Sequence, residues 1–153
     1  GVPRPHYAPL LGALEGVDLA ALRDRVNGRV RDAGVTFSTG EGELTVANLH
    51  DSSVPDWRVP DSELLRAAVF ADSVADPGDT LVLAGDFNVI RERSQTLEEL
   101  NGSDWGFTKP IAGIDQILVR GAASGNARRW PDERRLRDGR LLSDHAPVEV
   151  TIE

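Results

Sequence analysis

The pattern of apolar and polar positions along the chain predicts alternating helices and strands. Apolar residues recur at helical spacing over residues 18–27, and again from a cap at Asp61 or Ser62 to Val74. Short β-like runs separate these helical segments. The runs cover residues 35–37, 44–49, 81–84, 114–119 and 147–152, and loop-rich sequence fills 88–113. The first two runs flank a glycine-containing turn and predict a hairpin.

The order of the elements predicts an α/β protein with a mixed sheet. A strand, a crossover helix and a second strand follow one another between residues 44 and 84. The run at 81–84 is apolar throughout, which is typical of a strand that is buried on both faces. The total of 153 residues suffices for one compact domain.

Four sequence motifs share one feature: polar residues lie at or near the end of a β-like run. They are Asn48-Leu49-His50-Asp51, Gly85-Asp86-Phe87-Asn88, Gly113-Ile114-Asp115 and Ser143-Asp144-His145. Loops at strand ends gather into one site in α/β folds. Carboxylate and amide oxygens suit Mg²⁺ or Mn²⁺, and histidine transfers protons near neutral pH. The pattern therefore favours a metal-assisted hydrolytic centre.

Each motif also has a plainer interpretation. Asp86 and Asn88 either point together at a phosphate or form a strand-end turn in which they bond to the backbone. The Asp144-His145 pair is either part of the site or a turn with a solvated aspartate and a surface histidine. Asp115 heads an apolar strand, so we expect it to be partly buried and to need a partner such as a histidine.

Composition and charge narrow the function classes. The net charge of −8 argues against a sequence-independent nucleic-acid coat and is compatible with carboxylates that hold a divalent cation. The absence of cysteine excludes disulfides, cysteine zinc sites and thiol catalysis. No apolar run approaches the ~20 residues of a membrane helix. We therefore expect a soluble protein, either cytoplasmic or secreted. Lys109 is the one lysine among 17 basic residues, a bias typical of GC-rich genomes, so we expect a bacterial source.

The order of the motifs resembles that of the endonuclease/exonuclease/phosphatase superfamily. Leu-His, Gly-Asp-Phe-Asn, Ile-Asp-x-Ile-Leu and Ser-Asp-His follow one another from Leu44 to Ile152, and two of the motifs match letter for letter. The family includes deoxyribonucleases, abasic-site endonucleases, inositol polyphosphate phosphatases and bacterial sphingomyelinases. The resemblance implies a four-layer α/β sandwich with mixed, mostly antiparallel sheets flanked by helices. Residues 44–153 would be its C-terminal part, and residues 1–43 a loop, a short helix and a first strand.

The resemblance also implies a role for each site residue in metal-assisted hydrolysis of a phosphoester. His145 matches the general base, and Asp115 matches the aspartate that pairs with a catalytic histidine. Asp86 and Asn88 match the pair that activates water and contacts the phosphate, and His50 matches a phosphate-contacting histidine. The cofactor would be Mg²⁺ or Mn²⁺, and its implied ligands here are Asp144 and Asp86.

Three departures from the family pattern stand out. Asp51 adds a carboxylate beside His50, as a solvated loop residue or as a support for the site, and the first is favoured. Gly113 stands where many members carry arginine. Neither the usual Asn of the first strand nor the metal-binding Glu is found before His50. The chain is then a C-terminal fragment, a half-domain that needs a complementing segment or chain, or an inactive copy.

Two functions therefore compete: a metal-dependent phosphodiesterase or phosphatase, and an inactive binding or scaffold module that kept the fold. The intact set of six site residues favours the enzyme. The substrate is a phosphoester, and DNA is one candidate, because six arginines precede the last motif and are suited to guiding a polyanion. The alternative is a solvated loop in which these arginines pair with Asp132, Glu133 and Asp138.

Overall fold

The computed structural model describes residues 18, 21, 36–39 and 42–153. The helix predicted over 18–27 lies outside these residues apart from Asp18 and Ala21. At that point Asp18 Oδ1 accepts a hydrogen bond of 3.1 Å from the Ala21 backbone N–H, as a helix-capping residue does.

A four-stranded mixed sheet forms the centre of the fold. Its strands, in spatial order, are β1 (Thr36–Thr39), β2 (Gly42–His50), β3 (Thr80–Asp86) and β4 (Asp115–Arg120). The outer pairs β1–β2 and β3–β4 are antiparallel, whereas β2 and β3 run parallel. The predicted α/β class is therefore confirmed, and the predicted hairpin is the pair β1–β2. The four-layer arrangement stays a prediction.

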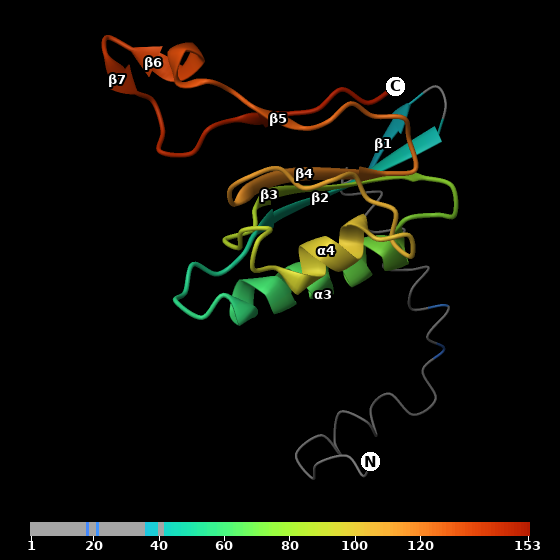
Figure 1. Ribbon diagram of the computed structural model, residues 1–153. Helices are drawn as coiled ribbons and strands as arrows, with labels where there is room; N and C mark the ends of the chain where they lie inside the picture. The colour runs from blue at the N-terminus through green and yellow to red at the C-terminus, as the bar shows by residue number, and fades with distance from the viewer. Residues whose placement is uncertain (1–17, 19–20, 22–35, 40–41) are drawn as a thin grey trace.

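Helix α3 (Arg58–Val74) makes the crossover between the two parallel strands and packs on one face of the sheet (Figure 1). It begins earlier than the predicted cap at Asp61 or Ser62, because Pro60 is tolerated in a first turn whose N–H groups are unpaired anyway. Asp61 is instead buried, and its carboxylate accepts a hydrogen bond from the Ser94 hydroxyl.

A second helix, α4 (Gln95–Asn101), lies beside α3 within the segment predicted to be loop-rich. Ser94 caps it, since the hydroxyl oxygen accepts a hydrogen bond of 2.9 Å from the Leu97 N–H. Leu97 and Leu100 are buried in the core between the helices and the sheet. Within the described part of the chain, no helix is long and apolar enough to cross a membrane.

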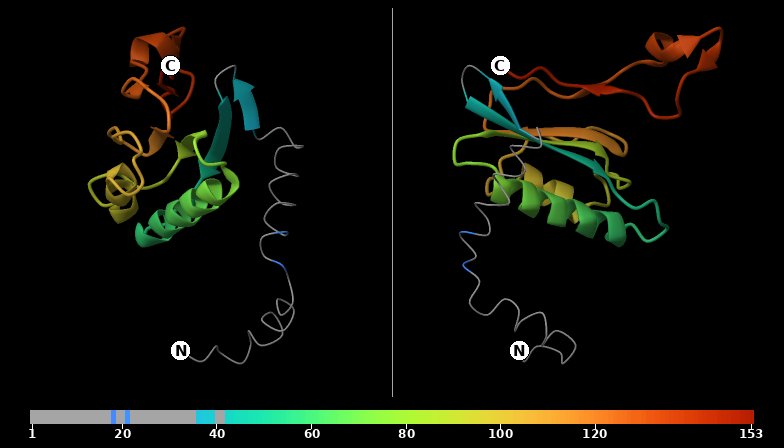
Figure 2. Two further views of the ribbon diagram at one scale, coloured as in Figure 1. Left: turned by 90° about the vertical axis from the view of Figure 1, so that its right-hand side faces the viewer. Right: turned by 180° about the vertical axis from the view of Figure 1, so that it is seen from behind.

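The C-terminal arm crosses the face of the sheet opposite the helices, projects beyond it as a hairpin and then returns to the C-terminus near β1 (Figure 2). It contains β5 (Arg128–Arg129), a 3₁₀ turn (Asp132–Arg135), the hairpin strands β6 (Leu136–Arg137) and β7 (Arg140–Leu141), and β8 (Val148–Glu149). These short strands form two separate two-stranded ladders, β5–β8 and β6–β7.

The last predicted strand, at 147–152, is largely wrong. Only Val148 and Glu149 form a strand, and they pair with β5 rather than with the central sheet. Pro147 has no N–H to give to a ladder, and its carbonyl accepts a hydrogen bond of 2.8 Å from the Trp130 N–H. The arm therefore forms a layer of its own above the sheet.

Candidate active site

Three neighbouring strands bring three polar side chains to one edge of the sheet. His50 is the register partner of Asp86 on β3, and Asp86 is the register partner of Asp115 on β4. Leu49 packs against the helical core, so the next residue along β2 points to the other face. The same alternation holds on β3 and β4. The row formed by His50, Asp86 and Asp115 therefore lies on the face that the C-terminal arm covers.

The sequence Gly-Asp-Phe-Asn is shaped by close packing at the end of β3. Gly85 has a φ of 138°, and a Cβ atom at this position would lie 1.9 Å from the carbonyl oxygen of Leu49. Phe87 is fully buried in the core, and its N–H donates to the Ile114 carbonyl at 2.9 Å. Glycine thus lets two strands approach, and phenylalanine anchors the turn that carries Asp86.

Asn88 closes this turn in the left-handed conformation, with a φ of 47°. Its backbone N–H donates to Asp86 Oδ1 at 2.9 Å, and its side-chain amide donates to the Asp51 carbonyl at 2.8 Å. The backbone-bonded turn foreseen as the plainer interpretation is thus present. It leaves Asp86 Oδ2 as the oxygen that faces the site.

His145 reaches the row from the arm and pairs with Asp115, as predicted. Its Nδ1 lies 2.8 Å from Asp115 Oδ1 and 3.9 Å from Asp86 Oδ2. An ionised carboxylate only accepts hydrogen bonds, so Nδ1 carries the donated proton and Nε2 is left as the basic nitrogen. The hydrogen bond to Asp115, followed by the charge of that carboxylate, raises the pKa of His145.

His50 stands on the other side of Asp86. Its Nε2 lies 3.9 Å from Asp86 Oδ2, and its side chain is 81% exposed. The carboxylate of Asp86 therefore sits between two imidazoles at equal distance. This arrangement brings His50, Asp86, Asp115 and His145 into one cluster, as the sequence predicted.

Asp144 and His50 are predicted site residues that the structure leaves outside the closest group of possible metal ligands. Ligand atoms of Asp86, Asp115 and His145 lie within 4.8 Å of one another, and Asp144 is not among them. The side chain of Asp144 is exposed, although its charge contributes to the raised pKa of His145. Asp144 as a metal ligand therefore stays a prediction.

Asp51 is buried, so the favoured interpretation of it as a solvated loop residue is wrong. The residue is 7% exposed, and its Oδ2 has no hydrogen-bond partner. Burial, and after it the charges of Glu63 and Asp86, together raise the pKa of Asp51 from 3.8 to about 6. Its backbone N–H donates to the Asp86 carbonyl at 3.0 Å, so Asp51 belongs to the framework of the site.

A cavity of about 410 Å³ opens between the sheet and the arm, and it is lined by three members of the cluster but not by His50. Its polar members include Asp86, Asp115 and His145. Its other lining residues are mostly apolar and come from both layers: Ala84, Ile117, Ala146, Pro147 and Val148. The cluster is therefore reached from a largely apolar cleft.

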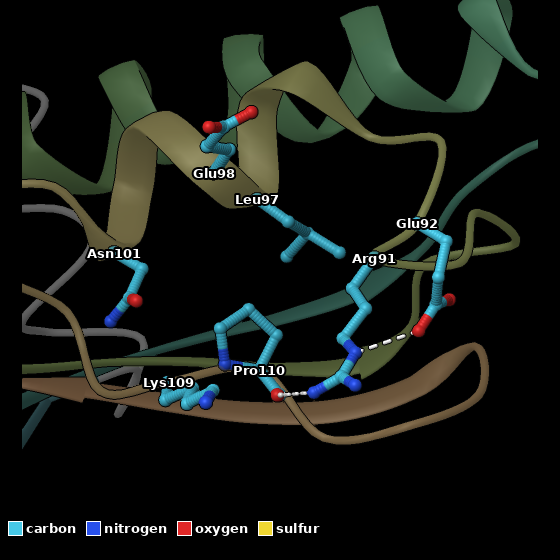
Figure 3. A pocket seen from close by; sticks show the side chains of 7 residues that line it. All are labelled: Arg91, Glu92, Leu97, Glu98, Asn101, Lys109 and Pro110. Carbon is cyan, nitrogen blue, oxygen red and sulfur yellow. Dashed lines mark hydrogen bonds and ion pairs between the residues drawn. The ribbon is translucent and has the colours of Figure 1, made fainter.

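A second cavity, of about 340 Å³, lies beside α4 (Figure 3). Arg91 and Lys109 line it, but the arginine is already paired with Glu92 at 2.7 Å and reaches the Pro110 carbonyl at 3.5 Å. It contains none of the predicted site residues, so the cavity under the arm is the better candidate.

Several arginines of the arm pair with acids, but only the pair of Arg135 with Asp132 is one that the solvated-loop interpretation predicts. Arg128 and Arg134 contact Glu149 at 2.8 and 3.6 Å, and Arg135 contacts Asp132 at 2.7 Å. Arg129 is different, because its guanidinium donates to the Ala112 carbonyl at 2.8 Å. Sequence reasoning did not single it out, since only the fold brings it close to the segment before Asp115.

In comparisons with known proteins, no protein-family model and no curated protein matches this chain.

Proposed function

We propose that this chain carries the hydrolytic residues of a Mg²⁺- or Mn²⁺-dependent phosphoester hydrolase of the endonuclease/exonuclease/phosphatase superfamily. The observation that supports it best is the hydrogen bond of 2.8 Å between Asp115 and His145, with Asp86 beside the imidazole. A carboxylate, an imidazole and a second carboxylate form the set that water activation requires.

The proposed roles follow from the orientation of His145. Asp115 holds Nδ1–H, fixes the tautomer and stabilises the imidazolium that forms when Nε2 accepts a proton from water. Asp86 Oδ2, which lies 3.9 Å from Nδ1 of the same imidazole, orients the attacking water. His50, which is exposed and faces Asp86, is placed to donate a hydrogen bond to a phosphoryl oxygen.

The residues present fit a divalent cation. Asp86 offers a carboxylate oxygen in the cluster, and the unpaired Oδ2 of Asp51 leaves further negative charge next to it. Hard oxygen donors of this kind suit Mg²⁺ or Mn²⁺, and we assign Asp86 and Asp144 as the ligands. A bound cation would neutralise phosphate charge and polarise the P–O bond.

The group of donors is small for a tight Mg²⁺ site. Mg²⁺ demands near-octahedral oxygen coordination, and Asp115 is already occupied by His145. We therefore propose that a further carboxylate comes from a complementing segment or chain outside these 153 residues. The competing function, an inactive binding or scaffold module, is favoured by Asn88, whose side-chain amide already donates to the backbone carbonyl of Asp51.

Phosphoester hydrolysis assays test the proposal. The 153-residue chain and any longer polypeptide that its gene encodes are assayed against DNA, RNA, bis(4-nitrophenyl) phosphate and phosphomonoesters, with Mg²⁺ or Mn²⁺. We expect the longer polypeptide to be active, the short chain slow, and chelation to stop turnover. His145→Ala and Asp86→Ala should each lower turnover by about 10²-fold or more, as loss of an acid–base group does. Exposed Asp104 provides the matched control, Asp104→Asn. Chelator-resistant activity, or full activity in His145→Ala, would refute the assignment.

A further inference from the structure

Arg129 occupies a space that glycine leaves open beside the candidate site. Gly113 has a φ of 101°, and a Cβ atom there would lie 1.9 Å from Nη2 of Arg129 and 2.9 Å from its Cζ. The guanidinium therefore lies directly on the glycine, and Nη2 donates to the Ala112 carbonyl at 2.8 Å. Any side chain at position 113 would be strained and would also displace the arginine.

The arginine joins the two segments that carry the paired catalytic groups. Arg129 is the register partner of Val148, which lines the cavity together with His145. Gly113 precedes Asp115 by two residues, which span at most ~7 Å. Arg129 does not itself line the cavity, and its guanidinium lies against the segment that leads into β4.

The ion pairing of Arg129 differs from that of three other arginines on the arm. Arg128, Arg134 and Arg135 have carboxylate partners. Among the described residues, no carboxylate lies within ion-pair distance of Arg129, and the one hydrogen bond found for its side chain goes to a backbone carbonyl. A guanidinium has five N–H donors, so most of them stay available.

The cluster next to it is acidic, since the carboxylates of Asp115, Asp86 and Asp144 all act on His145. A phosphate is repelled by such a set unless a cation meets it. We propose that Arg129 forms an anion subsite beside the cleft, where its guanidinium binds the oxygens of a phosphate group of the substrate. Planar guanidinium groups bind phosphate through two parallel hydrogen bonds. This inference rests on the proposed function, because it assigns that site a phosphate-bearing ligand.

Titration of the ¹⁵N-labelled 153-residue chain with inorganic phosphate tests the subsite directly. We expect saturable shifts of the Arg129 Nε–H and Gly113 amide signals. Arg129→Ala should weaken phosphate binding by about 10-fold or more, the size of a lost charge-assisted hydrogen bond. Gly113→Ala should weaken it too, although the charge is kept, because the methyl group displaces the guanidinium. Arg128→Ala, which removes a neighbour paired with Glu149, is the matched control and should leave binding unchanged.

Arg129→Lys is a second, milder variant for the case that Arg129→Ala fails to fold. Lysine keeps the positive charge but lacks the planar guanidinium, so we again expect weaker phosphate binding. Equal phosphate affinity in the wild type and in Arg129→Ala or Arg129→Lys would overturn the subsite, as would phosphate-induced shifts confined to other residues. Hydrolysis of bis(4-nitrophenyl) phosphate separates the two proposals. If phosphate binding depends on Arg129 but no turnover is found, the proposed hydrolase activity is refuted and the anion subsite is supported. If turnover is found but Arg129→Ala leaves KM unchanged, the hydrolase activity is supported and the anion subsite is refuted.

Discussion

Replacing Asp51 by asparagine should stabilise the protein at neutral pH. The carboxylate is 7% exposed, its Oδ2 has no hydrogen-bond partner, and Glu63 and Asp86 add like charge nearby. Burial thus raises the pKa of Asp51 from 3.8 to about 6. Asparagine has the same shape and no charge, so it removes the cost of ionisation while it keeps the packing.

The magnitude follows from the two pKa values. Because the folded state binds the proton more tightly than the unfolded state, ionisation of Asp51 lowers stability as the pH rises from about 4 to about 6. Each pKa unit corresponds to 1.36 kcal/mol, so the full cost above pH 6 is ~3 kcal/mol. Below pH 4 the carboxyl is protonated in both states and the cost disappears.

Urea unfolding between pH 4 and pH 8 measures this effect. The free energy of unfolding of Asp51→Asn should exceed that of the wild type by about 1–3 kcal/mol at pH 7, and the gap should close toward pH 4. Asp104→Asn, at an exposed position, should show no such pH-dependent gap. A gap that does not change with pH, or a variant less stable than the wild type at pH 7, would refute the reasoning.

Three further variants test other parts of the structure. Asp115→Asn should lower the pKa of His145, because it removes the carboxylate that raises it; an unchanged NMR titration of the imidazole would contradict the pairing. Ser94→Ala should lower the free energy of unfolding by more than ~1 kcal/mol, because it removes the cap of α4 and also the hydrogen bond to the buried Asp61 carboxylate; an unchanged urea midpoint would count against both contacts. Gly85→Ala should destabilise by more than ~2 kcal/mol, because its methyl group would collide with the Leu49 carbonyl; a melting temperature equal to that of the wild type would disprove the close approach.

The central strands could be predicted from the sequence because their apolar runs are short, continuous and bounded by turn residues. β3 and β4 contain the predicted runs at 81–84 and 114–119 almost entirely. Helix α4 was not predicted from the sequence, because its seven residues are too few to show a helical period among polar neighbours. β8 was predicted too long, because alternation at 147–152 does not reveal that Pro147 keeps this segment out of the sheet.

The site was predicted in part for the same reason. The residues of the row, His50, Asp86 and Asp115, stand at strand ends, and strand ends meet in space. Tertiary contacts that leave no local pattern were not predicted. The burial of Asp51 depends on packing at the strand end, and the contact between Arg129 and Gly113 joins positions sixteen residues apart across two layers.

Localising a bound metal ion tests the central claim most directly. Mn²⁺ is paramagnetic and broadens the signals of nuclei near it, so a titration of the chain labelled with ¹³C-histidine reports where the ion binds. The account predicts that the imidazole signals of His145 broaden first and that Asp86→Asn weakens Mn²⁺ binding by about 10-fold or more, whereas Asp104→Asn does not. Mn²⁺ that binds without broadening His145, or with equal affinity in Asp86→Asn, would contradict the account.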